Sequence, residues 1–146
     1  MRALFLLLST FWFLPSAFAA DEATVRVAIL QEVPSARVTV MAPCRILDAK
    51  SGALLKELPQ ILWQEARPSN PGVALGSLRW DAQAIVIEPK GETILRVNAH
   101  PYRGSFILYQ TPQGKLTVVN RLGLEEYLVG ALASEVNAGW PLEALK

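Results

Sequence analysis

Cysteine is almost missing from the chain, since Cys44 is the only one among 146 residues. An internal disulfide is therefore excluded, and the fold has to be stabilised by a packed core. Cys44 stands in the strand-like run at residues 44–47. We expect its thiol to be buried and inert rather than reactive or metal-ligating.

A long apolar run is also missing, because a membrane span takes about 20 residues. The apolar run at residues 3–14 is shorter, and it is followed by Pro15 and by the small side chains of Ala17 and Ala19. This pattern predicts a secretory signal peptide at residues 1–19 that is cleaved after Ala19. The alternative is an uncleaved membrane anchor. In both cases we expect the rest of the chain in the periplasm, the cell wall or the extracellular space.

The chain has no excess of either charge. It contains 14 Lys and Arg against 13 Asp and Glu, and removal of the signal peptide with Arg2 leaves 13 of each. A nucleic-acid-binding protein usually shows a basic stripe. The basic residues here are scattered singly along the sequence, so we expect no nucleic-acid partner.

Common catalytic signatures are absent from the sequence. It contains no glycine-rich phosphate loop, no paired metal-ligand spacing and no Gly-x-Ser-x-Gly motif. His100 is the only histidine and has no cysteine near it, so we expect it to make local hydrogen bonds. We assign no metal ligand and no cofactor to this segment.

Short stretches rich in Val and Ile alternate between apolar and polar residues, which is typical of half-buried strands. The predicted strands are residues 24–30, 37–42, 44–48, 84–88, 94–98, 105–109 and 115–120. Turn residues at 48–52 and 111–114 predict hairpins, with a glycine at the last position of each. The expected fold is α+β, a mostly antiparallel β meander or small barrel followed by short helices.

The alternation weakens between Pro59 and Asp81. Residues 66–72 read Ala-Arg-Pro-Ser-Asn-Pro-Gly, which predicts an exposed loop. We place a subdomain boundary or an insertion there.

Helical spacing appears after Asn120. Leu124, Tyr127 and Leu128 share one face of a short amphipathic helix that we expect to end at Gly130. Pro141 is typical of the first turn of a second helix. Because this helix has barely begun at residue 146, we expect the chain to be the N-terminal portion, residues 20–146, of a longer domain that is inactive in this form.

The C-terminal segment carries the most specific pattern. Residues 120–130 read Asn-Arg-Leu-Gly-Leu-Glu-Glu-Tyr-Leu-Val-Gly, and residues 133–146 read Ala-Ser-Glu-Val-Asn-Ala-Gly-Trp-Pro-Leu-Glu-Ala-Leu-Lys. This segment resembles the stage II sporulation protein D and LytB (amidase enhancer) family. The hallmark of the family reads Val-Asn, Leu-Glu-Glu-Tyr-Leu-x-Gly, Ser-Glu-Met-Pro and Trp-Pro-x-Glu-Ala-Leu-Lys. The upstream residues 102–104 and 114–120 also fit the family.

The resemblance implies an exported lytic transglycosylase that cleaves peptidoglycan glycan strands. The position that matches the family's catalytic glutamate is Glu135, while Val136 and Asn137 replace the usual methionine and proline, which puts the rigidity of this loop in doubt. Candidate substrate-binding residues are Tyr102, Arg103, Ser134 and Trp140. The resemblance also implies that a metal-associated Cys and His region lies further along in related proteins.

Simpler interpretations exist for these residues. Without the resemblance, Glu135 is an exposed loop acid, and Glu125 and Glu126 are the solvated first turn of a helix. Trp140 is then a packing anchor, and residues 102–103 are a strand-edge pair. The rival function is a non-catalytic accessory domain of the cell wall that enhances or recruits an amidase.

Overall fold

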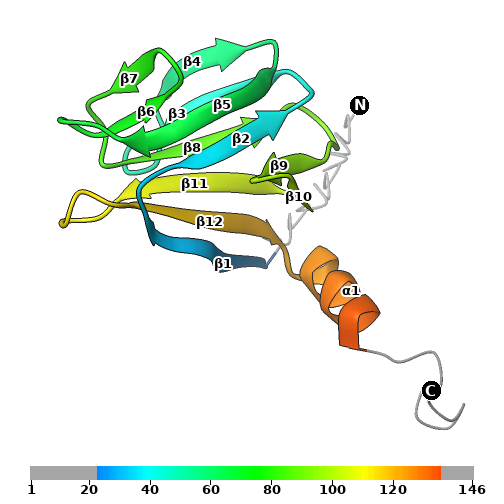
Figure 1. The fold of residues 1–146 in the computed structure, drawn as a ribbon. Helices are drawn as coiled ribbons and strands as arrows, with labels where there is room; N and C mark the ends of the chain where they lie inside the picture. Colours follow the sequence, from blue (N-terminus) through cyan, green and yellow to red (C-terminus); the bar gives the residue numbers. More distant parts are fainter. Residues whose placement is uncertain (1–22, 136–146) are drawn as a thin grey trace, which may run out of the picture.

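The computed structural model describes residues 23–135, which form two six-stranded antiparallel sheets and one helix (Figure 1). The signal peptide predicted at residues 1–19, the residue Trp140 and the second helix predicted at Pro141 lie outside the described residues. None of the helices within residues 23–135 is long and apolar enough to cross a membrane.

The strands divide between two sheets, which we call sheet A and sheet B. Sheet A has the order β1 (Thr24–Val33), β12 (Leu116–Gly123), β11 (Ser105–Gln110), β8 (Ala84–Pro89), β3 (Cys44–Asp48) and β4 (Leu54–Leu58). Sheet B has the order β10 (His100–Tyr102), β9 (Leu95–Val97), β2 (Ala36–Val40), β5 (Ile61–Pro68), β6 (Val73–Leu75) and β7 (Leu78–Trp80). The helix α1 (Leu124–Glu135) follows β12 and extends away from the end of sheet A (Figure 1).

The predicted α+β class with mostly antiparallel strands is confirmed. The described strands do not close into a barrel. They are not a simple meander either, because β1 pairs with β12 and β3 pairs with β8, strands that are distant in sequence.

One hydrophobic core joins the two sheets. In the central strands, residues that point inward are completely buried, among them Ile46, Phe106 and Leu108 of sheet A and Val38 and Leu95 of sheet B. Cys44 belongs to this core, as predicted, and burial raises the pKa of its thiol. A neutral, enclosed thiol is a poor nucleophile, so the expectation of an inert cysteine agrees with its position.

Both predicted hairpins form. β3 and β4 are joined by residues 49–53, and Asp48 accepts hydrogen bonds from the backbone N–H groups of Lys50 and Ser51, both at 2.8 Å. These two donors hold the pKa of the Asp48 carboxyl below its usual range. The second hairpin joins β11 and β12, and Gly114 adopts a φ of 70° there.

The region between Pro59 and Asp81 contains three strands that the sequence did not predict. A bulge in β5 opposite Thr39 breaks the alternation, and Trp63 lies there with a φ of 50° and its N–H bonded to Thr39 Oγ1 at 3.2 Å. The exposed loop predicted at residues 66–72 was placed too widely: residues 66–68 belong to β5, and Ala66 is completely buried. Only residues 69–72 form the turn between β5 and β6. The subdomain boundary or insertion placed there stays a prediction.

The helix was predicted to end at Gly130, which was wrong. α1 continues to Glu135, because a glycine inside a helix weakens it without ending it. Helical backbone therefore includes residues 134 and 135, which the sequence had placed in a loop.

Candidate functional site

A groove lies where the end of sheet A meets α1. Its larger part, about 650 Å³, is bounded by the turn after β10, by β12 and by the first half of α1. Its smaller part, about 430 Å³, extends along the loop before β9. The two parts share the lining residues Ile94, Arg103 and Glu126, so they form one continuous groove.

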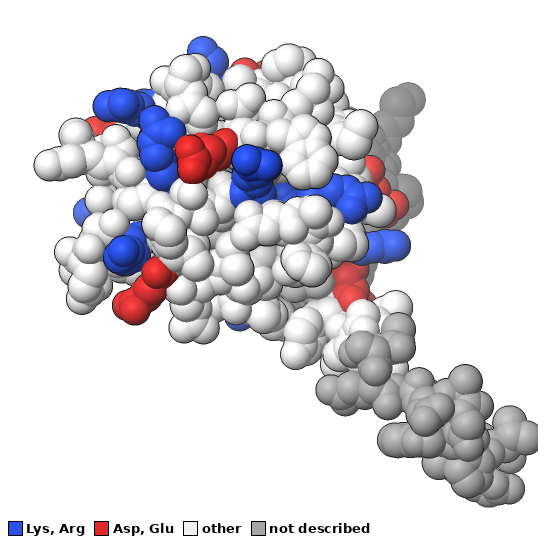
Figure 2. Space-filling model, in the orientation of Figure 1, with Lys and Arg blue, Asp and Glu red and all other residues white. Residues whose placement is uncertain are grey.

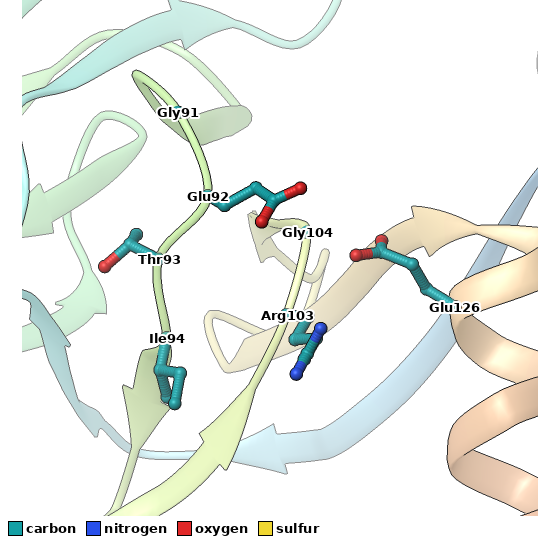
Figure 3. A pocket seen from close by; sticks show the side chains of 7 residues that line it. All are labelled: Gly91, Glu92, Thr93, Ile94, Arg103, Gly104 and Glu126. Carbon is teal, nitrogen blue, oxygen red and sulfur yellow. The ribbon is translucent and has the colours of Figure 1, made fainter.

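The groove mixes charged and apolar walls. Figure 3 shows the side chains of Glu92, Arg103 and Glu126 pointing into the same space from three different segments. Apolar surface comes from Tyr102, Leu122, Val129, Ile94 and Pro101. Few charged groups over an apolar floor are typical of sites that bind small organic or sugar ligands.

Arg103 is positioned by its backbone. Its carbonyl oxygen accepts a hydrogen bond of 2.7 Å from Nδ2 of Asn120, a residue 5% exposed in β12, and the same nitrogen also donates to the carbonyl of Ser105 at 3.1 Å. The Arg103 side chain is exposed and takes part in none of the ion pairs formed within residues 23–135. A guanidinium group on a fixed backbone is thus free to bind a ligand.

Gly104 makes this turn possible. It adopts a φ of 81°, and a Cβ at this position would lie 2.3 Å from the carbonyl oxygen of Arg121. Only glycine fits, which allows the chain to pass tightly from β10 in sheet B to β11 in sheet A.

Tyr102 stands on the inner side of β10. Its ring packs edge to face on Phe106, with ring centroids 5.8 Å apart and an interplanar angle of 74°. The ring is half-buried, packs against the core and also lines the groove.

The helix α1 forms the opposite wall. Its first N–H, from Leu124, donates to the carbonyl of Ala23 at 2.8 Å, which ties the helix to the start of β1. Glu125 and Glu126 occupy the first turn, where the helix dipole favours acids, and both line the groove. From the sequence, both were expected only to be solvated acids. No local pattern distinguishes a solvated acid from one that lines a groove.

The candidate catalytic residue ends this helix. Glu135 is the last residue of α1, and Ser134 precedes it, while the side chains of both lie outside what the structure describes. Glu135 lies nine positions after Glu126 in the helix, which corresponds to about 14 Å along the axis. The structure therefore brings Tyr102 and Arg103 to the first half of the helix that carries Glu135.

A metal site is not formed by these residues. Within residues 23–135, no group of three or more His, Cys, Asp or Glu side chains is placed to hold a metal ion. His100 is exposed in β10 and pairs with Val97 across the β9–β10 hairpin.

Residues 112–146 match the family model described as stage II sporulation protein, SpoIID. This match supports the resemblance that the motifs of the C-terminal segment predicted. The matched residues include β12 and α1, which form one wall of the groove. The name of the family relates the matched segment to sporulation.

A bacterial relative extends the similarity beyond this segment. An uncharacterized protein of Chlamydia muridarum (strain MoPn / Nigg) is 30% identical over 114 residues, which cover 77% of this chain and 39% of the relative. The chain thus spans about two fifths of the length of this relative. No solved structure matches the chain.

Proposed function

We propose that the chain belongs to an exported lytic transglycosylase that cleaves peptidoglycan glycan strands, with Glu135 as general acid and base. The observation that carries this proposal is the groove beside α1. One of its walls comes from the segment that the family model matches, and the other wall carries Tyr102 and Arg103. A glycan strand bound there would lie along the helix that ends at Glu135.

The lining suits a sugar. Carboxylates of Glu92, Glu125 and Glu126 accept hydrogen bonds from hydroxyl groups, and the Arg103 guanidinium donates them. The faces of sugar rings are apolar and can pack on Tyr102 and on the aliphatic side chains of the groove. Such a site binds a polyhydroxylated ligand without requiring a charge on it.

The proposed reaction needs only one carboxyl group at the cleaved bond, whereas ordinary glycoside hydrolases need two. Glu135 donates a proton to the leaving O4 as the bond between C1 and O4 breaks. The 6-hydroxyl of the same sugar attacks C1, and Glu135 takes up the proton of this hydroxyl as the bond between C1 and O6 forms. The product carries a 1,6-anhydro ring, and the carboxyl group returns to its protonated state.

The test compares two glutamine variants in the intact protein. Glu135→Gln keeps the size of the side chain but cannot transfer a proton, so the release of 1,6-anhydromuramyl ends should fall by about 10² to 10⁴. The matched control is Glu57→Gln on β4, whose carboxylate pairs with Lys90 and does not line the groove. It should cleave at the wild-type rate.

The outcomes separate the two functions considered from the sequence. Cleavage by Glu135→Gln at the wild-type rate would exclude Glu135 as the acid. If the wild-type protein binds glycan strands but releases no anhydro ends, the protein is an accessory domain, and stimulation of a wall amidase becomes the activity to measure.

A further inference from the structure

The outward face of sheet B gathers four arginines. Outward positions are those that alternate with the buried residues of each strand, and they hold Arg96 of β9, Arg37 of β2, Arg67 of β5 and Arg79 of β7. Glu65 is the one acid at these positions within the described strands of sheet B. Figure 2 shows the result as a band of Lys and Arg side chains across this face, interrupted by an acidic group. The described helix, α1, extends away from the end of sheet A and leaves this face uncovered (Figure 1).

Strand register spreads these arginines over the whole face. Arg96 and Arg37 are diagonal neighbours on adjacent strands, as are Arg37 and Arg67, so the separation at each of these steps is about 7–8 Å. Arg67 and Arg79 lie in one row with β6 between them, about 10 Å apart. The arginines therefore form an open array rather than one compact site for a small anion.

The charge of this face is mostly not neutralised. Arg67 contacts Glu65 at 3.5 Å. Arg37, Arg79 and Arg96 take part in none of the ion pairs formed among the described side chains. Nη1 of Arg96 donates to a backbone carbonyl of the β9–β10 hairpin at 3.2 Å, which orders the guanidinium group without cancelling its charge. Three arginines are thus left to bind an anionic partner.

An exposed tryptophan and an exposed methionine stand beside these arginines. Leu62 and Trp63 together form the bulge opposite Thr39. Leu62 lines a small cavity beside β4 of sheet A, so the next residue, Trp63, points outward, where it is 57% exposed. Met41 follows β2 at the next outward position after Thr39 and is 71% exposed. Both side chains would gain free energy from a partner that removes them from water.

We propose that this basic face, which comprises the four arginines together with Trp63 and Met41, lies on the surface of a bilayer that contains anionic phospholipids. The arginines bind lipid phosphate groups, to which a guanidinium group donates two parallel hydrogen bonds. Trp63 and Met41 enter the layer between the headgroups and the acyl chains, where tryptophan is enriched in membrane proteins. This inference goes beyond the cleavage proposed above and does not depend on Glu135.

The arrangement favours a bilayer over other acidic partners. A folded acidic protein holds its carboxylates at fixed positions, and a scattered array of arginines offers it no matching cluster. Lipid headgroups diffuse laterally, so they can gather under charges that are spread over a face. A single-stranded nucleic acid needs successive aromatic side chains for base stacking, whereas Trp63 is the one aromatic residue at outward positions of the described strands of sheet B.

The sequence also brings a bilayer close to this domain. The predicted signal peptide has its apolar run at residues 3–14, and residues 15–23 join that run to β1. These nine residues span at most about 30 Å. While the apolar run lies in a membrane, during export or as an uncleaved anchor, the domain is held next to the same bilayer.

The experiment measures sedimentation of the protein with phospholipid vesicles. The form that begins at Ala20 is used, so that the apolar run of the signal peptide does not contribute. One set of vesicles is phosphatidylcholine alone, and the other is an equal mixture of phosphatidylcholine and phosphatidylglycerol. The mixed vesicles should bind about 10²-fold more tightly, since each of the three unpaired arginines contributes about fivefold near an anionic surface. Added salt should reduce this ratio.

The variant that tests the arginines is Arg37→Gln/Arg79→Gln/Arg96→Gln. It should bind the mixed vesicles about as weakly as the parent protein binds the neutral ones. A control of equal charge, Arg26→Gln/Lys50→Gln/Lys115→Gln, changes exposed residues of sheet A and its two hairpins. This control should keep the preference for the mixed vesicles.

Trp63 reports whether the face enters the bilayer. Tryptophan emission should shift to shorter wavelength when mixed vesicles are added, because the indole ring leaves water. Trp63→Phe should keep most of the binding and lose this shift, which assigns the signal to Trp63 rather than to the other tryptophans of the chain.

Four results would overturn the proposal. They are equal binding of neutral and mixed vesicles by the parent protein, equal losses in the two triple variants, a Trp63 emission that mixed vesicles leave unchanged, and tighter binding to polyglutamate or to a single-stranded oligonucleotide than to mixed vesicles. The last of these would assign the basic face to an acidic protein or to a nucleic acid. None of them bears on Glu135, whose test reads anhydro ends.

Discussion

The outward faces of the two sheets differ in how their charges are arranged. On sheet A, Glu88 lies between Arg45, which it contacts directly, and Arg121 at 3.6 Å, while Lys90 pairs with Glu57 at 2.8 Å at the adjoining edge. On sheet B, three arginines have no such partner within the described residues. A chain with nearly equal numbers of acids and bases can therefore fold into one balanced face and one basic face.

The difference shows that the net charge of a chain does not predict how its charges are distributed over the surface. Arginines that are scattered in the sequence come together because outward positions recur every second residue and neighbouring strands align them. The absence of a basic stripe in the sequence was a correct observation, yet it did not predict the surface.

The largest expected effect comes from the core that the two faces share. Phe106→Ala removes the largest of the completely buried side chains and its contact with Tyr102, so it should lower the free energy of unfolding by about 3–5 kcal/mol. Urea denaturation followed by circular dichroism measures this. A loss below about 1 kcal/mol would mean that the core is less tightly packed than the structure shows.

A smaller effect is expected where the chain crosses between the sheets. Gly104→Ala adds a Cβ that would lie 2.3 Å from the Arg121 carbonyl oxygen and 2.8 Å from Cβ of Leu122, so the turn must shift. The free energy of unfolding should fall by about 1–3 kcal/mol, and glycan binding through Arg103 should weaken as well. Gly114→Ala is the control, because that glycine also has a positive φ but has open space around its Cβ position and does not line the groove.

The smallest effects should differ in sign between the two faces. Glu88→Gln leaves Arg45 and Arg121 without their partner, so stability at low salt should fall by about 0.5–1 kcal/mol. Arg37→Gln relieves repulsion on sheet B and should change stability by only a few tenths of a kcal/mol, in the stabilising direction. Unfolding of each variant at low and at high salt measures both effects. High salt should bring both changes in the free energy of unfolding toward zero. Equal losses would show that the faces do not differ.

Much of the fold could be predicted from local pattern. β3 has the predicted bounds, and six other strands overlap their predicted ranges, because one buried face imposes a period of two on the sequence. β5 was missed because its bulge shifts the alternation at Trp63, and the sequence also did not predict β4 or the three-residue strands β6, β7 and β10. α1 was predicted too short. A glycine ends a helix only where the backbone leaves the helical conformation, and the chain stays helical through Gly130.

The candidate site was predicted in part. Family motifs identified Tyr102, Arg103 and Glu135, and the structure places the first two in one groove beside the helix that carries the third. Glu92 and Ile94 were not predicted to be there, because they come from the loop before β9, far from the motif in sequence. Asn120 belongs to the motif. Its buried side-chain amide fixes the backbone of Arg103, which gives a structural reason for an asparagine at this position.

The sequence by itself determined the period-two strands, the two hairpins, the buried cysteine and the resemblance of the C-terminal segment to the family. These depend on near neighbours, whose side chains alternate across a strand or fill a turn. Tertiary structure alone decided how strands distant in sequence pair, which loop completes the groove and which arginines share a face. Such contacts depend on register between segments that are far apart in the chain, and no local pattern encodes that register.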